Sequence, residues 1–256
     1  MPYDSFKLKV RDLVVLETVM SQVSESVEEY LETIYRLEKR EASAKTSAIA
    51  REMNVKLGTV TNTIESLESQ GLIQHVPYKG VRLTDKGERI ALEVLRKHRL
   101  SERLLTDVLD MDWSEVHDAA CRLEHGLTGE LTRSIERTLG HPATCPHGNP
   151  IPSEAGRIEG EESVQLSSLK VHERAAISRI SDERPEMLRY LASLGLIPGA
   201  TVEVEERAPF DGPIMMKVMG ASYALGRNVA ATIWVKKRQN RAAEGRGDVV
   251  LVPQGH

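Results

Sequence analysis

Residues 46–83 decide the fold of the first part of the chain and read TSAIAREMNVKLGTVTNTIESLESQGLIQHVPYKGVRL. The apolar spacing in this stretch predicts a short helix over 47–53 and a second helix over 57–70, with a tight turn between them. Gly71 ends the second helix, because glycine readily adopts the left-handed conformation that follows a helix C-terminus. Two short helices across a tight turn are typical of a helix-turn-helix.

The sequence that follows predicts a β-hairpin. Residues 72–76 and 81–83 are strand-like and lie on either side of a turn at 78–80. A hairpin directly after a helix-turn-helix makes the unit a winged helix-turn-helix. Thr84 then caps a long helix that runs past His98.

The second of the two short helices has two different faces. Val60, Ile64 and Leu67 share one face, which we expect to pack into the core. Short hydroxyl, amide and basic side chains near the N-terminus of such a helix can reach base edges and phosphates in a major groove. A polar helix face is often only solvated, but the basic wing beside it favours DNA contact. The predicted DNA-binding residues are Thr46, Lys56, Gly58, Thr59, Thr61, Asn62, Lys79 and Arg82.

Composition limits the class of protein. The chain has 256 residues, of which 28% are charged and 40% hydrophobic, so it is long enough for two or three modest domains. The formal net charge of −4 argues against a protein that coats nucleic acid, but it leaves room for a local basic surface. No apolar run reaches the roughly 18 to 20 residues that span a bilayer, and the start of the chain lacks a secretory signal. We therefore expect a cytoplasmic protein with no membrane contact.

The second half of the chain changes character. Helical periodicity ends at Leu139, and glycine and proline residues then interrupt the sequence up to Pro152. Beyond residue 164, alternating apolar runs such as 202–204 and 233–235 predict a small β-barrel that includes one helix. The fold class that we expect is mainly α with a C-terminal β domain.

Residues 117–125, which read HDAACRLEH, carry the strongest chemical signal. Their donor side chains occupy positions i, i+4, i+7 and i+8 of a helix, which fall within one broad face. The preceding helix offers two more donors at i and i+4, and an antiparallel pair of helices can present both groups together. The six donors are His98, Glu102, His117, Cys121, Glu124 and His125.

The donor types indicate a transition metal. Imidazole, carboxylate and thiolate together suit a divalent first-row ion better than calcium or magnesium, which prefer all-oxygen shells. A single histidine is usually solvated and a single cysteine usually belongs to the core, but six donors in register on two helices are hard to dismiss. Cys145 and His147 form a C-x-H pair that we expect to be incidental, because the sequence offers it no partners. Cys121 and Cys145 do not form a disulfide framework.

These residues resemble the diphtheria-toxin-repressor family of iron- and manganese-dependent regulators. The likeness covers about residues 24–152 and rests on EEYLETIY at 28–35, RKHRLSERLL at 96–105, VHDAAC at 116–121 and GNPIP at 148–152. The C-terminal stretch LRYLASLGLIPG at 188–199 is similar to the SH3-like, or FeoA-like, domain of that family.

The resemblance implies two metal sites. The primary site would use Glu29, Cys121, Glu124 and His125. The second site would use His98, Glu102 and His117, and the candidates for further ligands from the C-terminal domain are Asp182, Glu183 and Glu186. Glu29 is a hard ligand and Cys121 a soft one, so the corepressor expected is Mn(II) or Fe(II).

The resemblance also implies a function and a division into domains. The protein would be a repressor that binds double-stranded operator DNA as a homodimer when it holds metal, controls metal-uptake genes and acts on no small-molecule substrate. The expected segments are an extension (1–24), a winged helix-turn-helix domain (25–92), a helical metal-binding and dimerisation domain (93–152), a linker (153–163), an SH3-like domain (164–238) and a disordered tail (239–256).

Two other classes of function compete with this reading. A metalloenzyme could use the same His/Glu/Cys cluster, but it would need an open coordination position and a placed general base, and it would not need the wing. A FeoA-like module that docks on a metal transporter would leave the first 150 residues without a role.

Overall fold

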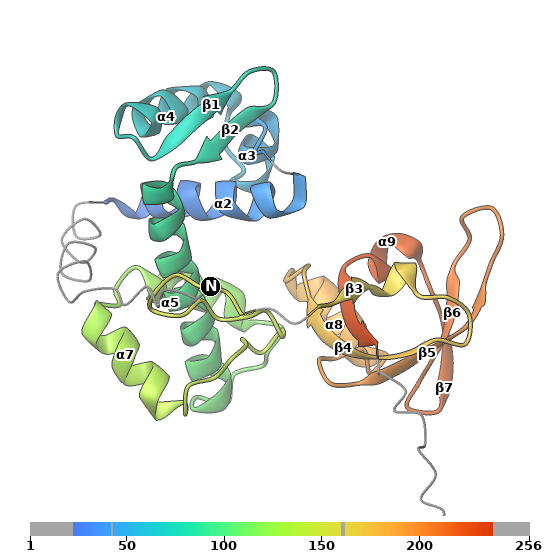
Figure 1. The fold of residues 1–256 in the computed structure, drawn as a ribbon. Helices are drawn as coiled ribbons and strands as arrows, with labels where there is room; N and C mark the ends of the chain where they lie inside the picture. The colour runs from blue at the N-terminus through green and yellow to red at the C-terminus, as the bar shows by residue number, and fades with distance from the viewer. Residues whose placement is uncertain (1–22, 42, 160–161, 238–256) are drawn as a thin grey trace, which may run out of the picture. The chain divides into compact units, whose positions relative to one another are not determined.

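The computed structural model describes residues 23–41, 43–159 and 162–237, which form two compact units (Figure 1). The first unit contains residues 23–159, without residue 42, together with 179–198; the second contains 162–178 and 199–237. The expected N-terminal extension, apart from its last two residues, and the expected C-terminal tail lie outside the described residues. Among the residues described, no helix combines the length and the apolar character that a membrane span requires.

The first unit contains the expected helix-turn-helix and hairpin. Its elements are α2 (Glu25–Glu41), α3 (Thr46–Glu52), α4 (Leu57–Ser69), β1 (Ile73–Val76), β2 (Gly80–Leu83), α5 (Asp85–Asp107), α6 (Val116–Glu124), α7 (Gly129–Thr138) and α8 (Pro185–Ser193). Val60, Ile64 and Leu67 of α4 are buried as expected. They belong to one apolar core with Leu31 and Ile34 of α2, so these helices hold each other in place.

The hairpin is fixed to the loop between α2 and α3. Strands β1 and β2 pair antiparallel, and Val81 forms an isolated bridge with Ala44. A side chain at Gly80 would place its Cβ 2.2 Å from the carbonyl oxygen of Ala44, and Gly80 has a φ of +112°. Only glycine allows this close approach, so the wing is attached rigidly to the helix-turn-helix.

Helix α5 follows the wing and runs past α2 toward α7, as Figure 1 shows. Its N-terminus is capped by the Thr84 hydroxyl, which accepts a hydrogen bond of 3.2 Å from the Gly87 backbone N–H. The helix packs against α2, α6 and α7. One continuous helix therefore spans from the wing to the region of the predicted metal ligands.

Residues 179–198 return to the first unit and are fixed to a loop that precedes them by about thirty residues. The backbone N–H of Ile180 donates to the carbonyl of His147 at 2.9 Å, and the Asn149 side-chain amide donates to the carbonyl of Ile180 at 2.9 Å. These bonds bring Glu183 to a defined place in the first unit.

The second unit contains the expected β domain. Its strands are β3 (Val164–Gln165), β4 (Arg174–Ile180), β5 (Thr201–Arg207), β6 (Ile214–Val218), β7 (Ala221–Leu225) and β8 (Ile233–Lys237), and its short helices are η1 (Leu166–Ser168) and α9 (Arg227–Ala230). The last two residues of β4 are counted with the first unit. The six strands form one sheet in the order β3-β8-β4-β5-β6-β7. Alternate residues such as Val202, Val204, Met216 and Val218 are buried, which is the period of a sheet with one face in a core.

Replacing Gly87 by alanine should destabilise the first unit. A Cβ at Gly87 would lie 2.0 Å from the carbonyl oxygen of Leu72, so we expect Gly87→Ala to lower the free energy of unfolding by about 1–3 kcal/mol. Gly58→Ala is the matched control, because a Cβ there meets nothing within 4 Å and alanine favours a helix by up to about 1 kcal/mol. Urea unfolding of the metal-free protein measures both, and wild-type stability of Gly87→Ala would contradict the close approach.

Candidate metal centre

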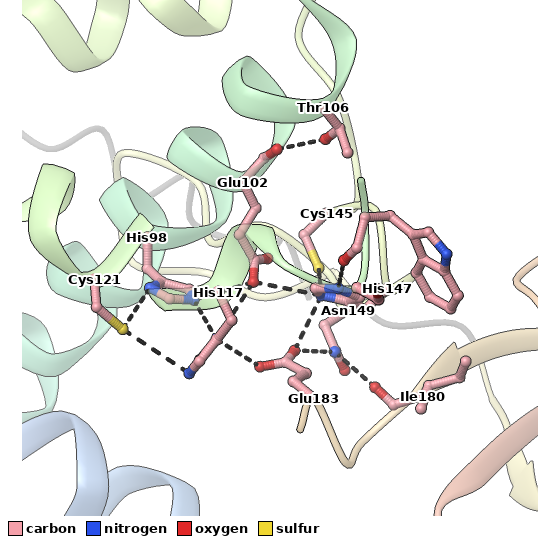
Figure 2. A network of polar contacts seen from close by, with 12 residues as sticks. His98, Glu102, Thr106, His117, Cys121, Cys145, His147, Asn149, Ile180 and Glu183 are labelled. Carbon is pink, nitrogen blue, oxygen red and sulfur yellow. Dashed lines mark hydrogen bonds and ion pairs between the residues drawn. The ribbon is translucent and has the colours of Figure 1, made fainter. Parts of the chain in front are cut away.

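Helices α5 and α6 bring four of the predicted metal ligands together (Figure 2). His98 and Glu102 lie one turn apart on α5 and are almost completely buried. His98 Nε2 is 3.1 Å from Glu102 Oε1 and 3.2 Å from His117 Nδ1. The Cys121 sulfur lies 3.9 Å from a ring nitrogen of His98 and 3.9 Å from one of His117.

A carboxylate from residues 179–198 completes this cluster. Glu183 Oε2 lies 3.5 Å from His117 Nδ1, and His98, Glu102, His117 and Glu183 can each present a donor atom within 4.8 Å of the others. Of the three candidates from the C-terminal part of the chain, only Glu183 reaches the cluster. Asp182 instead pairs with Arg184 at 2.6 Å, and Glu186 is exposed and faces Arg189.

A second group of donors shares two of these carboxylates. Cys145 and His147 are buried, and His147 Nδ1 lies 3.4 Å from Glu102 Oε1 and 3.7 Å from Glu183 Oε1. Glu102, Cys145, His147 and Glu183 have donor atoms within 4.8 Å of one another. The pair that we expected to be incidental thus has partners. The C-x-H spacing was the visible signal, but its partners are distant in sequence.

Glu29, the predicted ligand from α2, is not the side chain that meets the other predicted primary ligands. The side chain that meets His125 is that of Glu28, whose Oε2 lies 2.7 Å from His125 Nδ1. Glu28 is buried, whereas the predicted Glu29 is exposed. Adjacent residues of a helix point about 100° apart, and here α2 turns Glu28 rather than Glu29 toward the interior. Spacing could have identified Glu28, because it lies three and seven residues before the buried Leu31 and Tyr35.

The other predicted primary ligands are divided between the two sides of the centre. Glu124 contacts both sides, with Oε1 at 3.5 Å from His125 Nε2 and Oε2 at 2.6 Å from His98 Nδ1. Cys121 faces His98 and His117. Two of the predicted primary ligands therefore contact residues of the predicted second site.

The charges of the cluster compensate one another. Burial would raise the pKa of Glu102, but His98, His117 and His147 hold that pKa well below its usual value. Burial would lower the pKa of His117, but hydrogen bonds with Cys121 and Glu102 raise it to about 10. Burial likewise raises the pKa of Cys121, and its two histidine neighbours lower it by more. The histidines thus favour the ionised forms of Glu102 and Cys121, and these acidic groups favour the protonated form of His117.

These residues fit a divalent transition metal. Within the described part of the chain, the buried Oε2 of Glu102 has no hydrogen-bond partner, which is costly unless a cation satisfies it. The donors around it are imidazole, carboxylate and thiol, the set that first-row transition metals accept. A metal ion can replace the protons on the histidine rings, because ligands must be deprotonated to bind.

The predicted DNA-binding residues lie on the surface of the helix-turn-helix and wing. All of them are exposed except Thr46, which is half-buried. The Thr61 hydroxyl donates to the Leu57 carbonyl at 3.1 Å. The polar face of α4 therefore remains available for a partner, opposite the face that is packed in the core.

Comparisons with known proteins cover nearly the whole described chain. Family models match as "Iron dependent repressor, N-terminal DNA binding domain" over residues 22–81, as "Iron dependent repressor, metal binding and dimerisation domain" over 84–153, and as a FeoA domain over 164–237. The iron-dependent repressor IdeR of Mycobacterium tuberculosis is 33% identical over 198 residues, which are 73% of this chain and 86% of IdeR.

Two further relatives extend the likeness. The diphtheria toxin repressor of Corynebacterium diphtheriae is 30% identical over 228 residues, which are 85% of this chain and 100% of that protein. A solved structure of a manganese-dependent transcriptional repressor in complex with manganese has a TM-score of 0.77 and 36% identity, and the match covers 82% of this chain and 99% of that one.

His117 should stay protonated far above the pH at which an ordinary histidine loses its proton. Because folding raises the pKa of His117 from 6.5 to about 10, its ion pairs stabilise the metal-free fold fully below about pH 6.5 and cease to do so as the pH rises to about 10. An NMR titration of the ring nitrogens of metal-free protein measures this pKa, with the chain in denaturant as the control. A midpoint near 6.5 in the folded protein would contradict the described ion pairs.

Proposed function

Because the chain belongs to the iron-dependent repressor family, whose members are metal-dependent transcriptional repressors, we propose that it binds operator DNA as a homodimer when Fe(II) or Mn(II) is bound as corepressor. The observation that carries the proposal is the contact between Glu28 and His125, 2.7 Å apart. It joins the first helix of the DNA-binding part to the end of α6, next to the cluster of metal ligands. We propose that the protein acts in the cytoplasm and that its targets are metal-uptake genes. We assign the cluster no catalytic role.

We assign the metal ligands to three groups. The first is Glu28, Glu124 and His125; the second is His98, Glu102, His117 and Glu183, with Cys121 beside its two histidines; the third is Glu102, Cys145, His147 and Glu183. The second and third groups share Glu102 and Glu183, and a carboxylate has two oxygens with which it can bridge neighbouring ligand positions. The mixture of thiol and carboxylate donors lies between hard and soft, which agrees with either iron or manganese.

The bound ion would supply positive charge that replaces the histidine protons and links carboxylates of different helices. Glu28 then orients α2, and α2 shares its core with α4, so the position of the polar face of α4 follows the position of α2. In a dimer, two such helices one turn of DNA apart, about 34 Å, can enter successive major grooves. Lys79 and Arg82 on the wing are suited to phosphates.

The direct test is metal-dependent DNA binding by the full chain. We expect Mn(II) or Fe(II), added anaerobically to metal-free protein, to tighten binding to a labelled duplex from the gene's own upstream region. A tightening of about tenfold or more corresponds to about 1.4 kcal/mol of coupling between the two sites. Fluorescence anisotropy measures it, and the same affinity with and without either metal would contradict the proposal.

Glu28 and Glu29 form a matched pair of variants. Glu28→Gln should remove about tenfold or more of the metal-induced tightening, because it removes the charged partner of His125. Glu29→Gln removes the same charge from the exposed neighbouring position and should respond as wild type. The anisotropy titration is repeated on both variants, with circular dichroism to verify folding. The reverse ranking would restore Glu29 as the ligand from α2.

A further inference from the structure

Arg36 links α2, the first helix of the DNA-binding part of the chain, to a carboxylate of the metal centre. Its Nη2 lies 2.7 Å from Glu32 Oε1, one turn back on the same helix, and its Nη1 lies 3.6 Å from Glu183 Oε2. The same oxygen of Glu183 faces His117 Nδ1 at 3.5 Å. The guanidinium of Arg36 and the imidazole of His117, a predicted metal ligand, therefore approach the same oxygen atom of Glu183.

The surroundings of Arg36 are strongly acidic. The side chains of Glu32 and Glu183 are only 10% and 12% exposed, whereas that of Arg36 is 34% exposed. Burial lowers the pKa of Arg36, but Glu32, Glu183 and Glu102 raise it by more. Arg36 thus contributes the positive charge that these buried carboxylates require when no other cation is present.

Arg36 differs from the histidines of the centre in one respect. His98, His117 and His147 can release their protons and so become neutral ligands. A guanidinium does not lose its proton in proteins, so its charge persists and repels any second cation that approaches Glu183. Of the groups that face Glu183 Oε2, Arg36 is the one that cannot adapt by deprotonation.

We propose that Arg36 holds Glu183 in the metal-free protein and competes for it with the divalent cation, so that loading of the centre breaks the direct contact between α2 and residues 179–198. The inference rests on the proposed function and adds an element of regulation to it. Arg36 raises the metal concentration that is needed to load the groups containing Glu183. It also holds α2 in the metal-free arrangement until that concentration is reached.

The test compares metal affinity among charge variants of the full chain. Arg36→Met removes the guanidinium and retains an apolar stem, and Arg36→Gln is a second variant that can still hydrogen-bond to Glu32. Arg40→Met is the matched control, because Arg40 lies one turn later on α2 and pairs with Glu52 at 3.3 Å, with 58% of its side chain exposed. Arg36→Lys keeps the charge. Mn(II) binding to metal-free protein is measured by competition with a chromophoric chelator, without DNA.

We expect Arg36→Met and Arg36→Gln to bind Mn(II) about tenfold more tightly, about 1.4 kcal/mol, while Arg40→Met and Arg36→Lys remain close to wild type. A gain in affinity is informative because a damaged fold would lower it. Unchanged or weaker binding by both neutral variants, while wild type binds Mn(II), would overturn the role of Arg36 and leave the proposed function intact. Absence of Mn(II) binding and of Fe(II) binding by wild type would overturn both.

Discussion

The buried carboxylate of Glu102 is the constraint on which the first unit depends. It has no exposed surface, and an isolated carboxylate in such a place costs several kcal/mol unless positive charge surrounds it. Imidazoles from α5, from α6 and from the loop at His147 approach it within hydrogen-bond or ion-pair distance. His98 shares α5 with Glu102, whereas His117 and His147 come from two other segments. Their convergence on this one group brings the proposed metal ligands together.

Hydrogen bonds position the proposed ligands from the loop at 145–149 and from residues 179–198 before any metal binds. Asn149 donates to the Ile180 carbonyl at 2.9 Å and to Glu183 Oε1 at 2.7 Å, and Ile180 donates from its backbone to His147. The bonds to the carbonyls of Ile180 and His147 join neutral groups, whereas the bond to Glu183 is accepted by a carboxylate and is stronger for that reason. Glu183 and His147 are therefore already near Glu102 in the metal-free protein, so the energy of metal binding is not needed to assemble them.

Sequence patterns predicted what depends on local periodicity. They predicted the two helices and hairpin of residues 46–83 within one or two residues, and the i, i+4 pairs on α5 and α6 that form the cluster. Glu29 was expected at the centre because of the family resemblance, whereas the i, i+3 and i+7 spacing of Glu28, Leu31 and Tyr35 is the local pattern that turns Glu28 inward. Sequence patterns did not predict partners for Cys145 and His147, because the carboxylate of Glu183 reaches that loop only through tertiary contacts.

Helix α2 contacts the proposed metal centre at two points, Glu28 and Arg36. We expect the positive charge of a bound ion to attract the first and repel the second. Glu28 and Arg36 are eight residues apart, about 12 Å along the helix. Glu28 meets an imidazole that can exchange its proton for another cation, so positive charge at that end draws the carboxylate inward. Arg36 carries a permanent charge beside Glu183, so positive charge at the other end drives it outward. With the roles proposed for Glu28 and Arg36, metal loading would tilt α2 rather than simply shift it. Because α2 and α4 pack in one core, such a tilt would also move the face of α4 that we propose to contact DNA.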